Sequence, residues 1–393
     1  MLPRRGAAQP ETLASNHCPD DPLACELLLA LDAMMLAFKR AHSDWREPRW
    51  SDIAARVGSF TMRGIVTAVM VLGSVFSAQL ASRDRAEAQD RYQTSQGQTM
   101  IVVRGPVSAI MGSPPTERGR QPASDAAAEP QHTVNIRRSF AISTTEITNA
   151  QFRRFLEANP EAERRYAYDG APERMAKVLQ QFSPDADSPA IAVTWYEAAM
   201  YCNWLSGQEG LPASQWVYPA GTLRDGMHMP ADYLQRVGYR LPTEPEWEFA
   251  ARAGTATSRF FGDTDDPLGD YAWFARHPPR SRNDPVDPTD PQRAARVGLL
   301  KPNPLGLFDV YGNAWEWTQD RVSRFQTADV TDDREDPVLI VTDKDARTRR
   351  GGAFPYGAAF ARSAARGTVN SLPTHRRDNV GFRIAKTIAP TTP

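Results

Sequence analysis

Frequent glycine and proline residues constrain this chain more than any other feature of its sequence, because they interrupt both helices and strands. The 393 residues include 32 prolines and 25 glycines, and the apolar runs between them are short. The 9 tryptophans, 11 tyrosines and 16 phenylalanines can supply the burial that long regular elements would otherwise provide. The sequence therefore predicts a loop-rich domain with many aromatic side chains in its core.

Three segments have the apolar spacing of short helices: residues 149–157, 195–206 and 243–252. Each has a threonine that can cap its start, and the last two also have a glutamate three residues later, as in a capping box: Thr148; Thr194 with Glu197; Thr243 with Glu246. Short helices among irregular loops predict an α+β fold class. Arg240 and Arg252 flank the third helix, and we expect them to pair with its glutamates.

The bulk composition excludes some classes of function. Hydrophobic residues make up 41% of the chain and charged residues 24%, with a net charge of −1. This near-neutral balance offers no field for nucleic acid, so we expect no nucleic-acid partner. The 3 cysteines cannot form a disulfide framework or a CxxC metal site. Cys202 lies in the amphipathic segment 195–206, which favours a buried, unreactive thiol.

Residues 64–82 form a run of 19 residues without a charge, close to the roughly 20 that cross a bilayer as a helix. A buried soluble helix and a signal segment starting at Met62 are the alternatives. We favour an uncleaved membrane anchor with the C-terminal part outside the cytoplasm, because more Lys and Arg precede the run than follow it. The predicted division is an N-terminal region of unknown role (1–63), the anchor or signal segment (64–82), a linker (83–98), a single large domain (99–388) and a tail (389–393).

A series of motifs in the large domain resembles one known family. In chain order they are MGS (111–113), FAISTTEITNAQFRRF (140–155), PAIAVTWYEAAMYCNWLS (189–206), YRLPTEPEWEFAARAG (239–254), KPNPLGLFDVYGNAWEWTQD (301–320), RGGAF (350–354), RSAAR (362–366) and NVGFRIA (379–385). The series resembles the formylglycine-generating-enzyme, or sulfatase-modifying-factor, family, including bacterial members fused to kinases. The resemblance implies a modified C-type-lectin-like α+β fold with little regular secondary structure. No kinase motif is present.

Enzymes of this family bind copper through two cysteines that follow the RGG segment, and they oxidise a substrate cysteine to formylglycine. The resemblance places Tyr356 and Ala361 at the cysteine positions, Ala353 at a serine position and Phe360 at a tyrosine position. Copper(I) requires soft thiolate donors, which none of these side chains offers. The sequence therefore predicts no copper cofactor and no catalytic residues for the family's oxidase reaction.

The best-preserved site is the GLFDVYGNAWEW segment. The resemblance implies a structural calcium ion held by the side chains of Asp309 and Glu316 and by backbone oxygens of Val310, Gly312 and Ala314. Carboxylate and carbonyl oxygens are the ligands that calcium prefers. The alternative is a turn whose carboxylates bond to backbone amides.

The resemblance also implies a cleft for an extended peptide near the former copper site. Its predicted lining comprises Trp273, Phe354, Tyr356, Arg362 and Arg366. For the two arginines the alternative is a structural role as loop anchors, and for the aromatic residues a place in the core.

These features predict an extracytoplasmic binding or accessory module whose partner is a peptide, protein or glycan ligand. The alternative function is an oxidoreductase of altered chemistry, such as a non-haem metal oxidase with histidine and carboxylate ligands. The six histidines are scattered and lack the spacing of a local metal motif, which disfavours that alternative.

Overall fold

The computed structural model describes residues 91–121, 127–165, 171–221, 223–277, 287, 289–322, 330–369 and 371–389. The chain divides between residues 83 and 84 into two units, and every described residue belongs to the second. In the described part no helix is long and apolar enough to cross a membrane. The predicted anchor at 64–82 lies outside the described residues.

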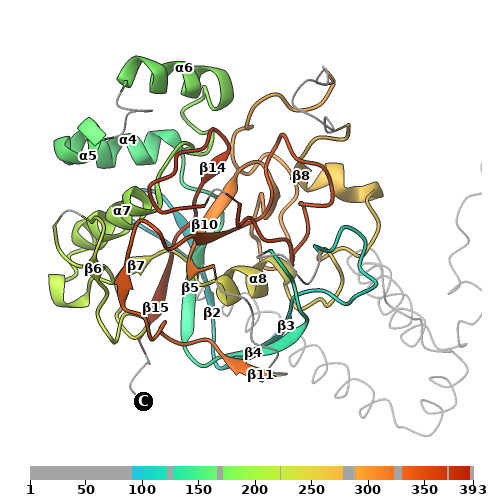
Figure 1. Ribbon diagram of the computed structural model, residues 1–393, viewed down its shortest axis with the longest axis horizontal. Coiled ribbons are helices and arrows are strands. Elements are labelled where there is room, and N and C mark those ends of the chain that lie inside the picture. Colours follow the sequence, from blue (N-terminus) through green and yellow to red (C-terminus); the bar gives the residue numbers. More distant parts are fainter. Residues whose placement is uncertain are drawn as a thin grey trace, which may run out of the picture. The chain divides into compact units, whose positions relative to one another are not determined.

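A five-stranded antiparallel sheet organises the domain (Figure 1). Its strands, in spatial order, are β1 (Arg91–Gln93), β2 (Thr99–Val103), β5 (Ser139–Ser143), β15 (Ala385–Ile388) and β7 (Tyr239–Arg240). Strand β5 pairs with β2 on one side and with β15, from the far end of the chain, on the other. This pairing joins the beginning and end of the domain in one sheet.

Four smaller sheets carry the segments around the candidate site. They are β13 (Arg347–Arg350) with β10 (Trp315–Arg321) and β14 (Val380–Gly381); β11 (Val330–Asp332) with β4 (His132–Ile136) and β3 (Val107–Met111); β12 (Ile340–Val341) with β6 (Met227–His228); and β8 (Ala272–Trp273) with β9 (Tyr311–Gly312). In the first of these, Glu316 pairs with Arg350 across antiparallel strands. The GNAWEW and RGG segments are therefore neighbours in space.

The three predicted helices are confirmed as α4 (Asn149–Ala158), α7 (Trp195–Gln208) and α8 (Glu244–Arg252), and all three begin with a capping box. Two further helices were not predicted, α5 (Pro160–Arg165) and α6 (Pro172–Phe182). Helix α6 has apolar side chains at helical spacing on one face, at Met175, Val178, Leu179 and Phe182, although only Met175 is buried. This spacing was an available signal in the sequence. The described residues also contain two short 3₁₀ helices, η2 (Ala213–Gln215) and η3 (Asp266–Asp270).

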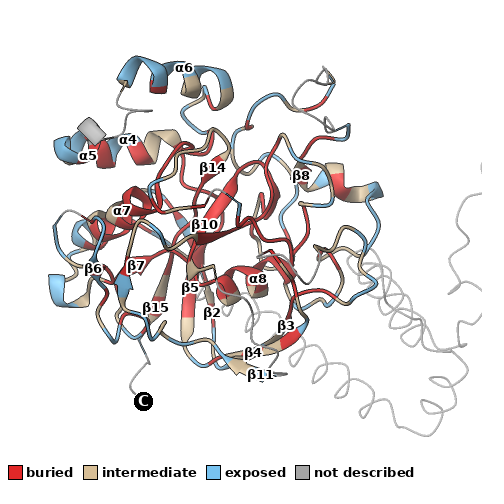
Figure 2. Ribbon diagram, in the orientation of Figure 1, coloured by how far each residue is buried: buried red, intermediate tan, exposed pale blue. Residues whose placement is uncertain are grey.

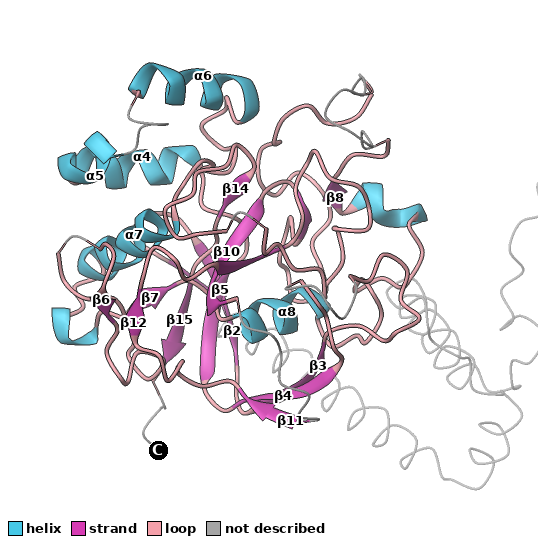
Figure 3. Cartoon of the chain, viewed as in Figure 1, coloured by secondary structure: helices cyan, strands magenta, loops and turns pink. Residues whose placement is uncertain are grey.

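The predicted α+β, loop-rich architecture is confirmed: loops occupy much of the chain in Figure 3, yet Figure 2 shows a buried centre. Aromatic rings supply much of that core. Tyr201 of α7, for example, contacts Phe152, Phe155 and Phe382 with ring centroids 5.4–6.0 Å apart. Cys202 is fully buried in the same cluster, as expected.

Buried ion pairs tie α8 to its surroundings. Arg240 lies 2.5 Å from Glu246, and Arg252 lies 2.7 Å from Glu248. Both pairs were expected from the sequence. Because a buried charge without a partner is costly, such pairs restrict how the surrounding loops can pack.

Candidate functional site

The loop at residues 353–361 brings together the four positions that the resemblance assigns to the copper site. Gly352 precedes the loop with φ +81°, and a Cβ on it would lie 2.8 Å from the carbonyl oxygen of Phe360. Only glycine allows this approach, so the loop folds back on its own start. Within it, the amide of Tyr356 donates to the carbonyl of Ala353 at 2.9 Å.

Two buried arginines hold this loop through its backbone. Arg259 donates to the carbonyls of Ala361 and Ala358 at 2.7 and 2.9 Å, and Arg362 donates to that of Ala359 at 2.8 Å. Neither arginine contacts the loop through a hydrogen bond to one of its side chains. The path of the loop is therefore set by carbonyl contacts.

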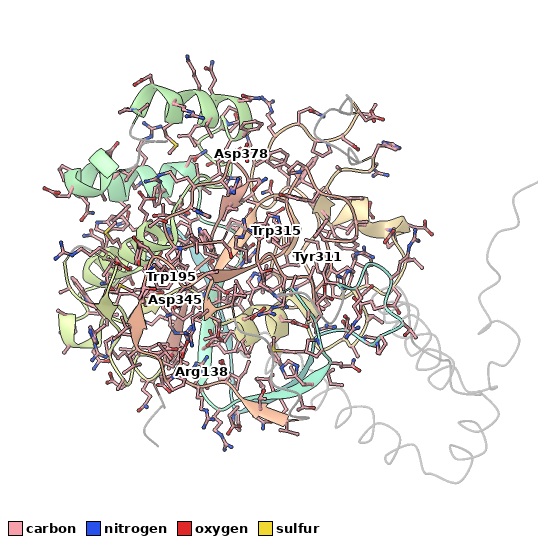
Figure 4. All side chains as sticks on the ribbon, in the orientation of Figure 1. Arg138, Trp195, Tyr311, Trp315, Asp345 and Asp378 are labelled. Carbon is pink, nitrogen blue, oxygen red and sulfur yellow. The ribbon has the colours of Figure 1, made fainter. Side chains whose placement is uncertain are left out.

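The side chains at the four positions are apolar or phenolic. Ala353 and Ala361 are buried, Phe360 is half-buried, and Tyr356 is 36% exposed. Tyr356 and Phe360 pack against Trp315 of β10, labelled near the middle of Figure 4, with ring centroids 6.0 and 6.2 Å from it. This aromatic group occupies the predicted site of the thiolates.

Cys202, the cysteine of the described domain, is a buried core residue and does not belong to this loop. Cys202 lies inside the core on α7, and burial raises the pKa of its thiol well above the usual range. Within the described ranges, no three His, Cys, Asp or Glu side chains are arranged to hold a metal ion.

The predicted ligand cleft needs correction. Phe354 is buried against Phe182 of α6, with centroids 6.2 Å apart. Arg362 and Arg366 are buried in ion pairs, so their guanidinium groups do not line an open surface. Among the predicted lining residues, Tyr356 is exposed and Trp273 is half-buried.

The partners of the two arginines explain this correction. Arg362 bonds to Glu129 at 2.7 Å and also to Glu117, while Arg366 bonds to Glu244 at 2.6 Å. Buried arginines require such carboxylates. Both residues therefore have the structural role that the sequence left open as an alternative.

A cavity of about 700 Å³, which the sequence did not reveal, lies beside residues 357–359 of the loop. It combines small residues with charges of both signs: Pro114, Thr116, Glu117, Arg118, Gly119, Ala256, Thr257, Ser258, Arg259, Asp263, Asp265, Gly357, Ala358 and Ala359. None of the predicted cleft residues contributes to it. Three segments distant in sequence form its wall, which is why no local pattern indicated it.

The loop from Asp309 to Glu316 has the sharp turn expected from its Gly–Asn pair. Asp309, Gly312 and Asn313 all have positive φ, at +55°, +80° and +54°. Asp309 is buried, and its Oδ2 accepts a hydrogen bond from the amide of Gly298 at 2.7 Å. Its Oδ1 is buried without a hydrogen-bond partner, an arrangement that is costly for a carboxylate.

Glu316 is held more completely. Arg383 donates to both of its carboxylate oxygens, at 2.5 and 2.7 Å, and the Trp247 indole donates at 2.6 Å. This ion pair is fully buried. The structure thus combines a satisfied carboxylate at Glu316 with an unsatisfied one at Asp309.

Glu146 is a third carboxylate at this place, and the sequence reasoning missed it. It accepts hydrogen bonds from the amide of Ala314 at 2.9 Å and from the side chain of Asn313 at 2.7 Å. Burial raises its pKa well above the usual range, and repulsion from Asp309 and Glu316 adds to the shift. An acidic residue in the short segment between β5 and α4 was the available signal.

Burial also raises the pKa of Asp309, to about 6, and Glu316 contributes repulsion. Three carboxylates thus face one guanidinium, that of Arg383, so the ionised cluster has an excess of negative charge. The carbonyl oxygens of Val310 and Ala314 face the same glycine, since a Cβ on Gly351 would lie 3.5 and 3.9 Å from them. Carboxylate and carbonyl oxygens are the donor types that calcium takes, and Asp309 Oδ1 is without a partner. Both oxygens of Glu316, however, are already bonded to Arg383 and Trp247, and these carboxylates do not form a three-ligand cluster in the described residues.

Together the sheet order, the loop-rich core and the two loops define the class of protein: an α+β domain with the C-type-lectin-like fold of formylglycine-generating enzymes. Two solved structures are similar in fold. The Treponema denticola variable protein 1 superposes with a TM-score of 0.53 at 24% identity, covering 76% of this chain and 98% of that one. PvdO from Pseudomonas aeruginosa gives 0.51 at 22% identity, with the same coverage.

Residues 84–388 match the model of the sulfatase-modifying factor enzyme 1-like domain, and the chain belongs to this family. The formylglycine-generating enzyme of Streptomyces coelicolor is 31% identical over 279 residues, which are 65% of this chain and 80% of that protein. The bovine enzyme is 27% identical over 280 residues, 65% of this chain and 67% of its own. The mouse inactive C-alpha-formylglycine-generating enzyme 2 is 27% identical over 305 residues, covering 70% and 82%.

Proposed function

We propose that this chain is a non-catalytic member of its family, which acts as a binding or accessory module for a peptide, protein or glycan ligand. The observation that carries the proposal is the chemistry of residues 353–361. The two positions assigned to copper-binding cysteines are a tyrosine and an alanine. A phenol and a methyl group cannot replace thiolates as ligands for copper(I).

The surroundings of the loop support the same conclusion. Ala353 and Ala361 are buried by apolar neighbours, and Tyr356 packs on Trp315 and Phe360. Cys202 is enclosed in the core. The family also includes members named as inactive, such as the mouse inactive C-alpha-formylglycine-generating enzyme 2, which is 27% identical to this chain.

No specific observation favours the alternative of a non-haem metal oxidase. In the described part of the chain, His132 bonds to the Pro130 carbonyl at 2.9 Å, and His277 lies near Asp287 and Asp290. Neither grouping has the geometry of a metal site.

Calcium is proposed as a structural cofactor. Asp309 and Glu316 would hold it with backbone oxygens of Val310, Gly312 and Ala314, and Glu146 adds negative charge beside them. When bound, the ion would neutralise the carboxylates and fix the turn. The unpartnered Oδ1 of Asp309 supports this assignment.

The proposed location of the domain is outside the cytoplasm, anchored to the membrane through residues 64–82. The uncharged run and the distribution of Lys and Arg around it support this location. N-terminal sequencing of the mature protein would distinguish an anchor from a cleaved signal.

A direct assay tests the lack of oxidase activity. The purified full chain is incubated with copper(I), oxygen, a thiol reductant and a peptide containing a CxPxR motif, and the peptide mass is measured. We expect no formylglycine, whereas the Streptomyces coelicolor enzyme in parallel should convert the peptide. Conversion by the wild-type chain would contradict the proposal.

A matched variant tests the placement of the loop. The double substitution Tyr356→Cys with Ala361→Cys restores two thiols, and we expect it to bind copper(I) while the wild-type chain does not. Equal copper binding by both proteins would show that the metal is held elsewhere.

A further inference from the structure

Most buried arginines of the described domain have a carboxylate within 4.0 Å of the guanidinium group, whereas Arg349 of β13 has none. The buried arginines that have a carboxylate within this distance are Arg240, Arg252, Arg259, Arg350, Arg362, Arg366 and Arg383. Arg347 has no close carboxylate either, but three aspartates attract it from farther away. Arg349 is only 7% exposed, so its charge is both buried and uncompensated.

The contacts of Arg349 leave part of its guanidinium unused. Its Nη2 donates to the Val369 carbonyl at 2.7 Å, whereas its Nε is buried without a partner. The group also lies 5.5 Å from the ring centroid of Trp317 and 5.9 Å from that of Trp315. Cation–π contacts of this kind offset only part of the cost of burying a charge.

Arg349 and Tyr356 lie against the same indole: the guanidinium is 5.9 Å and the Tyr356 ring 6.0 Å from the ring centroid of Trp315. Arg377 is a second cation close enough to repel Arg349. Burial and the repulsion from Arg377 lower the pKa of Arg349 to about 10, and Tyr356 opposes this shift. The positive charge is thus disfavoured within the protein alone. An external anion would remove this penalty.

Tyr356 supplies the accessible part of this place. The Tyr356 side chain belongs to a residue that is 36% exposed. Val369, whose carbonyl bonds to Arg349, is 69% exposed. Half-buried Phe360 packs on Tyr356 with centroids 5.3 Å apart. An accessible phenol beside an uncompensated cation and apolar side chains would be complemented by a ligand that carries a hydrogen-bond acceptor next to an apolar group.

We propose that Arg349 and Tyr356 bind a carboxylate of a peptide ligand, with Phe360 and Val369 contacting an apolar side chain next to it. The inference rests on the proposed binding function and names the chemistry of its ligand. An uncharged glycan offers no anion for Arg349, and a free inorganic anion offers nothing for the exposed apolar groups. A peptide with glutamate or aspartate beside an aromatic residue satisfies both.

The test uses the full chain and fluorescein-labelled heptapeptides with glutamate, glutamine or lysine at the centre, flanked by phenylalanines. Fluorescence anisotropy measures the Kd. We expect the glutamate peptide to bind the wild-type chain about tenfold more tightly than the glutamine peptide, since a hydrogen bond to a charged group contributes on that scale. The lysine peptide should bind most weakly.

Arg349→Gln should remove the preference for glutamate and leave the affinity for the glutamine peptide unchanged. Arg118→Gln is the matched control, because Arg118 is an exposed arginine in the cavity wall and has no carboxylate partner in the described residues. Tyr356→Phe removes only the hydroxyl and should reduce the preference in the same direction. It keeps the test decisive if Arg349→Gln does not fold, which its thermal melt would reveal.

Equal affinity for the glutamate and glutamine peptides, or a preference that survives Arg349→Gln, would overturn the inference while leaving a peptide-binding function intact. Binding of neither peptide would also overturn it, as would binding of a sulfated oligosaccharide alone. Failure of the broader proposal has a separate readout, namely conversion of the CxPxR peptide.

Discussion

Replacement of Arg362 by methionine separates a structural role from a role in ligand binding. Arg362 is buried and makes hydrogen bonds to Glu117, Glu129, the Gly119 carbonyl and the Ala359 carbonyl. Its loss would leave Glu129, which is fully buried, without a counter-charge. Breaking such a buried pair costs about 3–5 kcal/mol.

That loss is a large fraction of the roughly 5–15 kcal/mol that stabilises a typical domain. At about 2–4 °C per kcal/mol for a domain of this size class, we expect the midpoint of thermal unfolding to fall by roughly 6–20 °C. Chemical denaturation of purified wild-type and Arg362→Met proteins would measure the change in unfolding free energy. Arg118→Gln, an exposed site, should change it by less than about 0.5 kcal/mol.

A second variant tests the cause of the destabilisation. Adding Glu129→Gln to Arg362→Met removes the uncompensated charge, so the double variant should recover at least about 1 kcal/mol relative to the single one. If Arg362→Met unfolds within about 0.5 kcal/mol of the wild-type protein, or if the second substitution gives no recovery, the argument for a buried anchor is wrong.

Three further outcomes follow from the titrating groups. Asp309→Asn removes a buried charged group whose pKa is raised to about 6, so in EDTA at pH 7.5 its free energy of unfolding should exceed that of the wild type by about 1–3 kcal/mol. Added calcium should raise the melting midpoint of the wild type only. An equal rise in both proteins would contradict the placement of the ion. The pKa of Asp320 is raised to about 8 by burial and neighbouring carboxylates, so this residue lowers stability progressively as pH rises from about 4 to 8, and Asp320→Asn should flatten that dependence in urea unfolding measured at pH 5 and 8.5. Cys202, in a variant whose other cysteines are replaced by serine, should react with a thiol reagent only at the rate of domain opening, because burial raises its thiol pKa; fast labelling under native conditions would show an accessible thiol.

Local spacing in the sequence predicted the elements whose signals are themselves local. Thr194 and Glu197 form the capping box that opens α7, three residues apart, as their positions indicated. The pairing of Arg252 with Glu248 is a contact of four residues along one helix. The spacing of three short helices among loops predicted the α+β class, and the order of the motifs indicated the family and its fold. The family match and the similar solved structure confirm both.

Contacts between distant segments were not available from such spacing. Arg362 and Glu129 are 233 residues apart in the chain, and no periodicity relates them. Glu146 reaches the turn at Ala314 from 168 residues away. Whether an arginine binds a ligand or a buried carboxylate depends on these long-range partners, which explains why Arg362 and Arg366 were assigned to a cleft.

The carbonyl contacts of Arg259 and Arg362 have a consequence for how the segment 353–361 can change. Because these hydrogen bonds go to backbone carbonyls, the loop can keep its conformation when its side chains change, provided that Gly352 remains. Random libraries at the exposed positions Tyr356 and Ala359 should consequently yield mostly folded proteins, with diversity confined to one small surface patch. Substitutions at these surface positions should therefore change what the domain binds without changing its fold.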